Sequence, residues 1–158
     1  MCVKFKIAEC VKTHTPPNYS VRYLRYGRLR GSIDFDAQVI TCREPKSRKS
    51  LVVFLHECGH HACDHRTVDK PLHVREYEAH QWSFDTMRTF GIQIPLEMIQ
   101  RAKFHTLWCI MRDQDKGVRI DPRIRRFAQD YPWYNVCPRN FDSRSTAATL
   151  EATYRQAV

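Results

Sequence analysis

The stretch from Leu51 to His65, which reads LVVFLHECGHHACDH, constrains the fold and chemistry of this chain more than any other. Its centre is an H-E-x-x-H pattern formed by His56, Glu57 and His60. Two histidines four residues apart lie on one face of a helix, from which both imidazoles can bind one tetrahedral metal ion, usually zinc. Glu57 then faces the open coordination position, where zinc lowers the pKa of a water molecule to about 7 and the carboxylate takes its proton. The pattern predicts His56 and His60 as zinc ligands and Glu57 as general base.

A zinc ion held by two histidines needs a third protein ligand, which a second helix can supply. Pro71 and Gly91 suit the start and the end of such a helix, and the apolar residues between them have broadly helical spacing. Glu76 and Glu78 lie on it about 200° apart, so only one of them can face the metal. Periodicity places Glu78 toward the core side and Glu76 on the side of His80, and it leaves the choice open. The candidates for the third ligand are Asp64, His65, His73, Glu76, Glu78 and His80.

The segment LHECGHHACDH, followed by REYEAHQWS, resembles the ImmA/IrrE family of zinc metallopeptidases from mobile elements, phages and bacterial stress regulators. That family has H-E-x-x-H and then a helix with the pattern E-A-[N/D]-x-[F/W]-A. The resemblance covers roughly residues 24–100. It implies that Zn²⁺ is the cofactor, that Glu57 is the general base and that Glu78 is the third ligand. This chain departs from the family pattern at His80 and Ser83, and it matches at His56, Glu57, His60, Glu78, Ala79 and Trp82.

The segments on either side of the metal helix predict a small sheet and further helices. Residues 21–43 alternate apolar and polar side chains with period two, with a break at 36–38 that is typical of a hairpin. Residues 44–50 resemble a polar loop in which Ser50 caps the metal helix. Residues 3–7 suit either an edge strand or a short helix. Helices are expected at 96–112 and 123–129.

These elements predict an α+β, minimal zincin-like domain over residues 1–139, with a small antiparallel sheet packed on the H-E-x-x-H helix. Residues 140–158 are expected to form a C-terminal tail that is mobile or docks on a partner. A chain of 158 residues is long enough for one core without covalent staples. It has seven cysteines but no recognisable export signal, which predicts reduced thiols in the cytoplasm. No apolar run approaches the 18 residues of a membrane span.

The net charge of +9 suits a nucleic-acid partner, an acidic protein or simple solubility. The basic segment Arg119–Arg126, followed by the aromatic residues of Tyr131–Tyr134, can bind single-stranded nucleic acid, but capping the core is the simpler interpretation.

The motif predicts a zinc-dependent peptidase with a protein substrate, and the resemblance suggests a transcriptional repressor. The alternative is a non-catalytic zinc-containing module that binds nucleic acid or an acidic protein through its basic surface. Glu57 favours the enzyme, because a closed structural site needs no carboxylate beside an open position. The residue that stabilises the oxyanion stays unassigned among Tyr77, His61, His65, His73 and His80.

Overall fold

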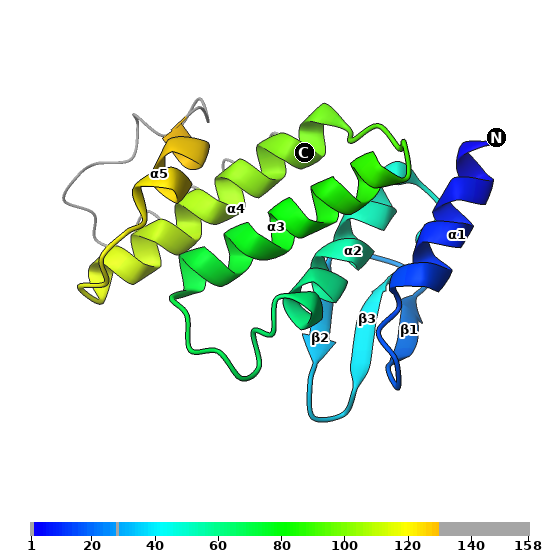
Figure 1. Ribbon diagram of the computed structural model, residues 1–158, viewed down its shortest axis with the longest axis horizontal. Helices are drawn as coiled ribbons and strands as arrows, with labels where there is room; N and C mark the ends of the chain where they lie inside the picture. The colour runs from blue at the N-terminus through cyan, green and yellow to red at the C-terminus, as the bar shows by residue number, and fades with distance from the viewer. Residues whose placement is uncertain (1, 28, 130–158) are drawn as a thin grey trace.

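The computed structural model describes residues 2–27 and 29–129 of the chain. Within those ranges it has five helices and one three-stranded sheet (Figure 1), so the α+β prediction is confirmed. None of these helices is both long and apolar enough to cross a membrane. The elements in chain order are α1 (Val3–His14), β1 (Ser20–Leu24), β2 (Gly31–Asp34), β3 (Val39–Arg43), α2 (Arg48–Ala62), α3 (Leu72–Thr89), α4 (Leu96–Asp115) and α5 (Pro122–Gln129).

The sheet is mixed, whereas the sequence was expected to form an antiparallel one. Strands β2 and β3 form the predicted antiparallel hairpin, in which Asp34 pairs with Val39. The chain reverses once between β1 and β2 and again between β2 and β3, so β1 and β3 run in the same direction. Because β3 lies between the other two strands, it pairs with β1 in parallel, with Ser20 beside Val39. The strand order, and not the number of hairpins, therefore determines the sheet type.

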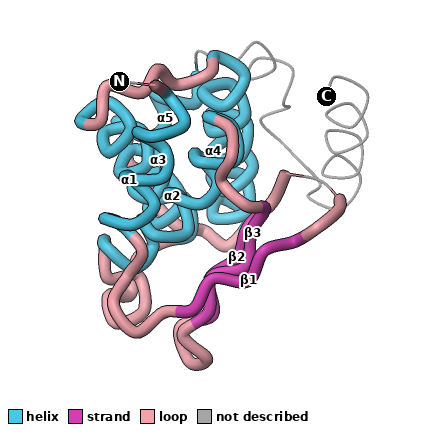
Figure 2. The backbone as a smooth tube through the Cα atoms, turned by 90° about the vertical axis from the view of Figure 1, so that its right-hand side faces the viewer, coloured by secondary structure: helices cyan, strands magenta, loops and turns pink. Residues whose placement is uncertain are grey.

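The N-terminal segment, for which either a strand or a helix was expected, forms α1. Its residues Ile7 and Cys10 are buried in the core, while Phe5 lies on the solvent side. Helix α2 contacts α1, α3, β2 and β3, and it is therefore the centre of the domain. Figure 2 shows the consequence, with the helices gathered on one side and the strands on the other.

Helix α2 begins three residues earlier than expected. Ser47, and not Ser50, is its N-cap, and the two serines form a capping box in which each side chain accepts the other's backbone N–H. The expected apolar run is fully buried, with Leu51, Phe54 and Leu55 at 0 % exposure. This burial fixes the rotation of α2 and therefore the direction in which the following histidines point.

The last two helices close the other end of the domain. Figure 1 shows α3 and α4 side by side along most of their lengths. Ile124 and Ala128 of α5 are buried in an apolar cluster with Leu107 and Ile110 of α4, so α5 caps this end of the core. The expectations for Tyr131–Tyr134 and for the tail at 140–158 lie outside the described residues.

Candidate metal centre

Helices α2 and α3 bring three potential ligand atoms together. His56 Nε2 lies 3.1 Å from Glu76 Oε2 and 3.2 Å from His60 Nε2, and His60 Nε2 lies 3.5 Å from Glu76 Oε2. In a tetrahedral site with zinc–ligand distances of about 2.0–2.1 Å, neighbouring ligand atoms are about 3.4 Å apart. The three measured distances match this value, so His56, His60 and Glu76 form a face that can hold a metal ion.

The carboxylate at this face is Glu76, whereas the family resemblance implied Glu78. Glu78 Oε2 instead accepts a hydrogen bond from Lys70 Nζ at 2.7 Å and lies 2.9 Å from His65 Nε2. Ala79 packs directly against Gly59 where α3 crosses α2, which turns the side of α3 that carries Glu76 toward the histidine pair. We therefore replace Glu78 by Glu76 in the candidate ligand set.

Glu78 nevertheless acts on the centre through His65 and His60. Burial favours the neutral carboxylic acid, but hydrogen bonds from Lys70 and His65 outweigh it and lower the pKa of Glu78. The ionised carboxylate can only accept, so the proton of the neutral His65 ring lies on Nε2 and its Nδ1 is an acceptor. His60 Nδ1, 2.9 Å from His65 Nδ1, is then the donor. This leaves the lone pair of His60 Nε2 facing the metal position, which is the tautomer that a ligand requires.

Glu57 lines a cavity of about 250 Å³ beside the three-ligand face. Burial of this carboxyl group raises its pKa to about 7, and a group that titrates near neutrality can both take and return a proton. Gly31 on β2 lies against it, because a Cβ at Gly31 would be 2.7 Å from Glu57 Oε1. The cavity is lined by Arg30, Gly31, Val52, Val53, His56, Glu57, His80, Met98, Arg101, Ala102, Phe104 and His105.

The protonation states of the face suit a metal ion. Burial lowers the pKa of His56 to about 4, so this ring is neutral near pH 7. Burial acts to raise the pKa of Glu76, but the neighbouring His56 and His60 rings outweigh it and hold the pKa below its ordinary range. A neutral imidazole and an ionised carboxylate are the forms that bind metals.

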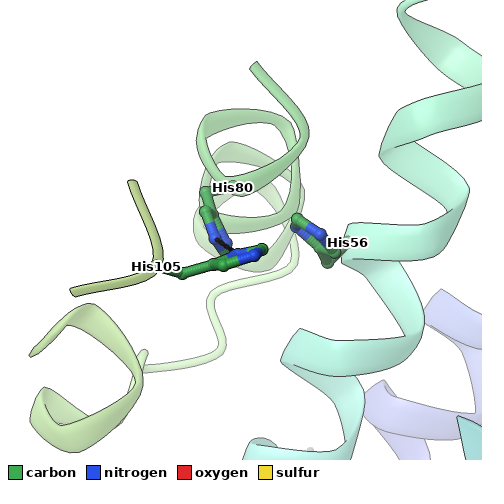
Figure 3. A group of neighbouring side chains, drawn as sticks. All are labelled: His56, His80 and His105. Atoms are coloured by element: carbon green, nitrogen blue, oxygen red, sulfur yellow. Dashed lines mark hydrogen bonds between the residues drawn. The ribbon is translucent and has the colours of Figure 1, made fainter. Parts of the chain in front are cut away.

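Two further histidines adjoin the face, and one of them was missed by the sequence reasoning. His80 of α3 and His105 of α4 converge on His56 (Figure 3), with His80 Nε2 3.2 Å from His105 Nδ1. His105 Nδ1 lies 3.7 Å from Glu76 Oε2. His105 belongs to no short motif. The available signal was its helical spacing from Ala102, which places it on the inner side of the helix expected at 96–112.

The remaining sequence candidates have other contacts. Cys63, His65 and Glu78 also form a group of metal-ligand type, but Lys70 already neutralises this carboxylate. His61 packs against the ring of Tyr19, Tyr77 packs against Phe127, Asp64 bonds to Thr67, and His73 pairs with Asp113.

Comparison with protein-family models, curated proteins and solved structures finds no match for this chain. A functional assignment therefore depends on the geometry of the site, and the ImmA/IrrE resemblance stays a prediction.

Proposed function

We propose that this protein is a zinc-dependent peptidase of the zincin type, with His56, His60 and Glu76 as ligands and Glu57 as general base. One observation carries the proposal. Three ligand atoms lie 3.1–3.5 Å apart, and a second carboxyl group, that of Glu57, lines the cavity beside them. Structural zinc sites are usually closed by four protein ligands, whereas catalytic sites keep one position open for water and substrate.

In this mechanism the residues of the chain hold the metal and move one proton. A bound zinc ion supplies a Lewis acid that polarises the scissile carbonyl and acidifies a water molecule. Glu57 takes the proton of that water as it attacks the carbonyl carbon, and then passes it to the leaving amine. The hydrogen bonds that link Lys70, Glu78 and His65 to His60 keep the lone pair of His60 Nε2 free to bind the metal ion. Glu78 is therefore a positioning residue.

The proposed substrate is a protein segment, with a transcriptional repressor as the example that the resemblance suggests and a bacterial or phage-infected cytoplasm as the setting. The cavity has apolar walls that include Val52, Met98 and Ala102. Its lining also contains the cationic residues Arg30 and Arg101. This combination suits an apolar or acidic side chain next to the scissile bond.

The test combines metal analysis with peptide cleavage. Wild-type protein should bind one zinc ion per chain. Glu76→Ala should weaken binding by more than the 10–100-fold that is typical for loss of an outer-shell partner, whereas Glu78→Ala should fall within that range. A peptide library with mass-spectrometric detection then compares wild type with Glu57→Gln, which should keep zinc and lose cleavage by roughly 10²–10⁴-fold. Cleavage by Glu57→Gln at the wild-type rate would remove the general base, and a folded wild type that binds no zinc would end the proposal.

A second candidate function is nucleic-acid binding at a basic groove between β1, β3 and the start of α2. This groove has a volume of about 630 Å³, and Tyr26 beside it is 89 % exposed. Its cationic residues can contact phosphates while the tyrosine stacks on a base. Affinity for a single-stranded oligonucleotide should then fall steeply with salt, and absence of binding at low salt would exclude this function. The cations are Arg25, Arg43, Lys46 and Lys49.

A further inference from the structure

Three imidazoles from three different helices converge beside the proposed catalytic face. His56 from α2, His80 from α3 and His105 from α4 each place a ring nitrogen within 4.8 Å of the other two (Figure 3). His80 Nε2 and His105 Nδ1 are 3.2 Å apart, close to the separation of about 3.4 Å between nitrogens that share a tetrahedral zinc ion. The proposed hydrolysis gives no role to His80 or His105.

Packing holds these two rings in place. His80 is 8 % exposed, and its ring stacks on Phe84 with 6.3 Å between ring centroids and lies 4.2 Å from the ring centroid of His56. The His105 ring stacks on Trp108 at 6.0 Å. Two of the three residues, His56 and His80, are buried, so an ion that enters has little freedom of these side chains to remove.

Two nitrogens of this cluster are unsatisfied. His56 Nδ1 and His80 Nδ1 are buried and have no hydrogen-bond partner among the described residues. Buried polar atoms in native proteins are nearly always paired, so these two atoms show that the polar groups of this cluster are not satisfied by the described residues alone. Nitrogen atoms of neutral imidazoles are preferred ligands of Zn²⁺, Co²⁺, Ni²⁺ and Cu²⁺.

We propose that His56, His80 and His105 form a second, all-histidine position for a transition-metal ion next to the His56–His60–Glu76 face. Both positions use His56, so the chain binds one ion that can adopt either ligand set. An ion in the all-histidine position leaves His60 and Glu76 without metal, and it is therefore held in an inactive arrangement. This position shares one ligand with the proposed catalytic centre, but it does not depend on peptidase activity.

The test uses His60→Ala, which removes a ligand of the His56–His60–Glu76 face (the first ligand set) and leaves the all-histidine position intact. Zn²⁺ binding to the full chain is measured by competition with a chromophoric chelator. His60→Ala should still bind one Zn²⁺ per chain, and His60→Ala/His105→Ala should bind at least about 10-fold more weakly. The matched control is His60→Ala/His61→Ala, which removes another imidazole of α2 that belongs to neither set and should bind as His60→Ala does.

Equal affinities of His60→Ala and His60→Ala/His105→Ala would overturn the second position, as would loss of all Zn²⁺ binding in a folded His60→Ala. In both cases the peptidase proposal survives if wild type binds one Zn²⁺, whereas a folded wild type that binds none removes both proposals. Circular dichroism establishes that each variant folds. If His60→Ala does not fold, Glu76→Ala breaks the first set instead, and its comparison with Glu76→Ala/His105→Gln decides the question by the same criterion.

Discussion

Helix α3 takes part in two histidine–carboxylate clusters, and they differ in how their nitrogen atoms are satisfied. At its start, His73 is fully buried, and its backbone N–H donates to Asp113 Oδ2 at 2.8 Å. The backbone N–H of Asp121 donates to His73 Nε2 at 3.3 Å, so the ring proton lies on Nδ1 and is donated to Asp113 at 2.6 Å. Each polar atom of this ring has a partner, and the cluster joins α3, α4 and the start of α5.

In the second cluster, at the middle of α3, the nitrogens of His56 and His60 face each other and the same oxygen of Glu76. Bare lone pairs at this distance repel one another unless a proton or a cation lies between them. Each nitrogen of the His73 ring has its own partner, whereas the His56 and His60 nitrogens share one carboxylate oxygen. Crowded ring nitrogens that share one acceptor, and not buried histidines as such, therefore mark the candidate metal position.

The largest effect should come from breaking the satisfied cluster. Asp113→Ala leaves two buried donors of His73 without an acceptor, and each buried donor left unsatisfied typically costs about 1–3 kcal/mol. Denaturant unfolding should show this loss, while Zn²⁺ affinity of the folded variant should stay within about 3-fold of wild type. A large loss of Zn²⁺ affinity in a folded Asp113→Ala would mean that the two clusters are coupled.

Removing His65 tests whether the candidate metal cluster depends on a residue that binds no metal itself but contacts the ligand His60. His65→Ala removes the acceptor that fixes the tautomer of His60, and losses of this kind reduce metal affinity about 10–100-fold. Competition with a chelator measures the change in affinity. The control is His61→Ala, which removes a histidine of α2 that packs on Tyr19 and belongs to neither ligand set. Unchanged Zn²⁺ affinity in His65→Ala would show that the hydrogen bonds linking Lys70, Glu78, His65 and His60 have no part in metal binding.

The sequence predicted the part of the candidate site that lies on one helix. His56, Glu57 and His60 follow from the spacing of four residues, because helical geometry alone puts both rings on one face. The choice between Glu76 and Glu78 depends on which side of α3 meets α2, and close packing of Gly59 on Ala79 decides this. Periodicity within one segment contains no information on such a crossing.

Contacts between segments that are distant in sequence could not be predicted from local sequence patterns either. His105 reaches the site only because α4 packs on α3, and the parallel pairing of β1 with β3 results from strand order. The capping box of Ser47 with Ser50 was within reach of local reasoning, but the charged run 44–50 resembled a loop. Local periodicity thus predicts elements, whereas the partners of each element are determined by tertiary packing.

A substitution at Gly59 tests the crossing that separates the roles of Glu76 and Glu78. A Cβ there would lie 2.9 Å from the backbone oxygen of Ala79, which cannot move aside as a side chain can. Gly59→Ala should therefore destabilise the fold by about 1–3 kcal/mol and also weaken Zn²⁺ binding. Gly31→Ala is the matched control, because its Cβ meets the side chain of Glu57 instead of a helix backbone and should change cleavage more than metal affinity. Equal stability of Gly59→Ala and wild type would mean that the helices do not need this close contact.

The smallest effect concerns the acid dependence of the metal-free protein. Burial lowers the pKa of His56 from 6.5 to about 4, and burial also lowers the pKa values of His65, His80 and His105. The unfolded chain then binds more protons than the folded one below pH 6.5, so stability should fall as the pH falls through this range. Glu57 acts in the opposite direction, because burial raises its pKa from 4.5 to about 7 and its contribution to stability is lost as the pH rises.

Four histidines outweigh one carboxyl group, and denaturant unfolding at about pH 7 and about pH 5 should show lower stability in acid. His105→Gln should reduce this difference because the substitution removes one of the four rings. Higher stability in acid would mean that the rings are charged in the folded state, and such rings cannot be ready to receive a metal ion.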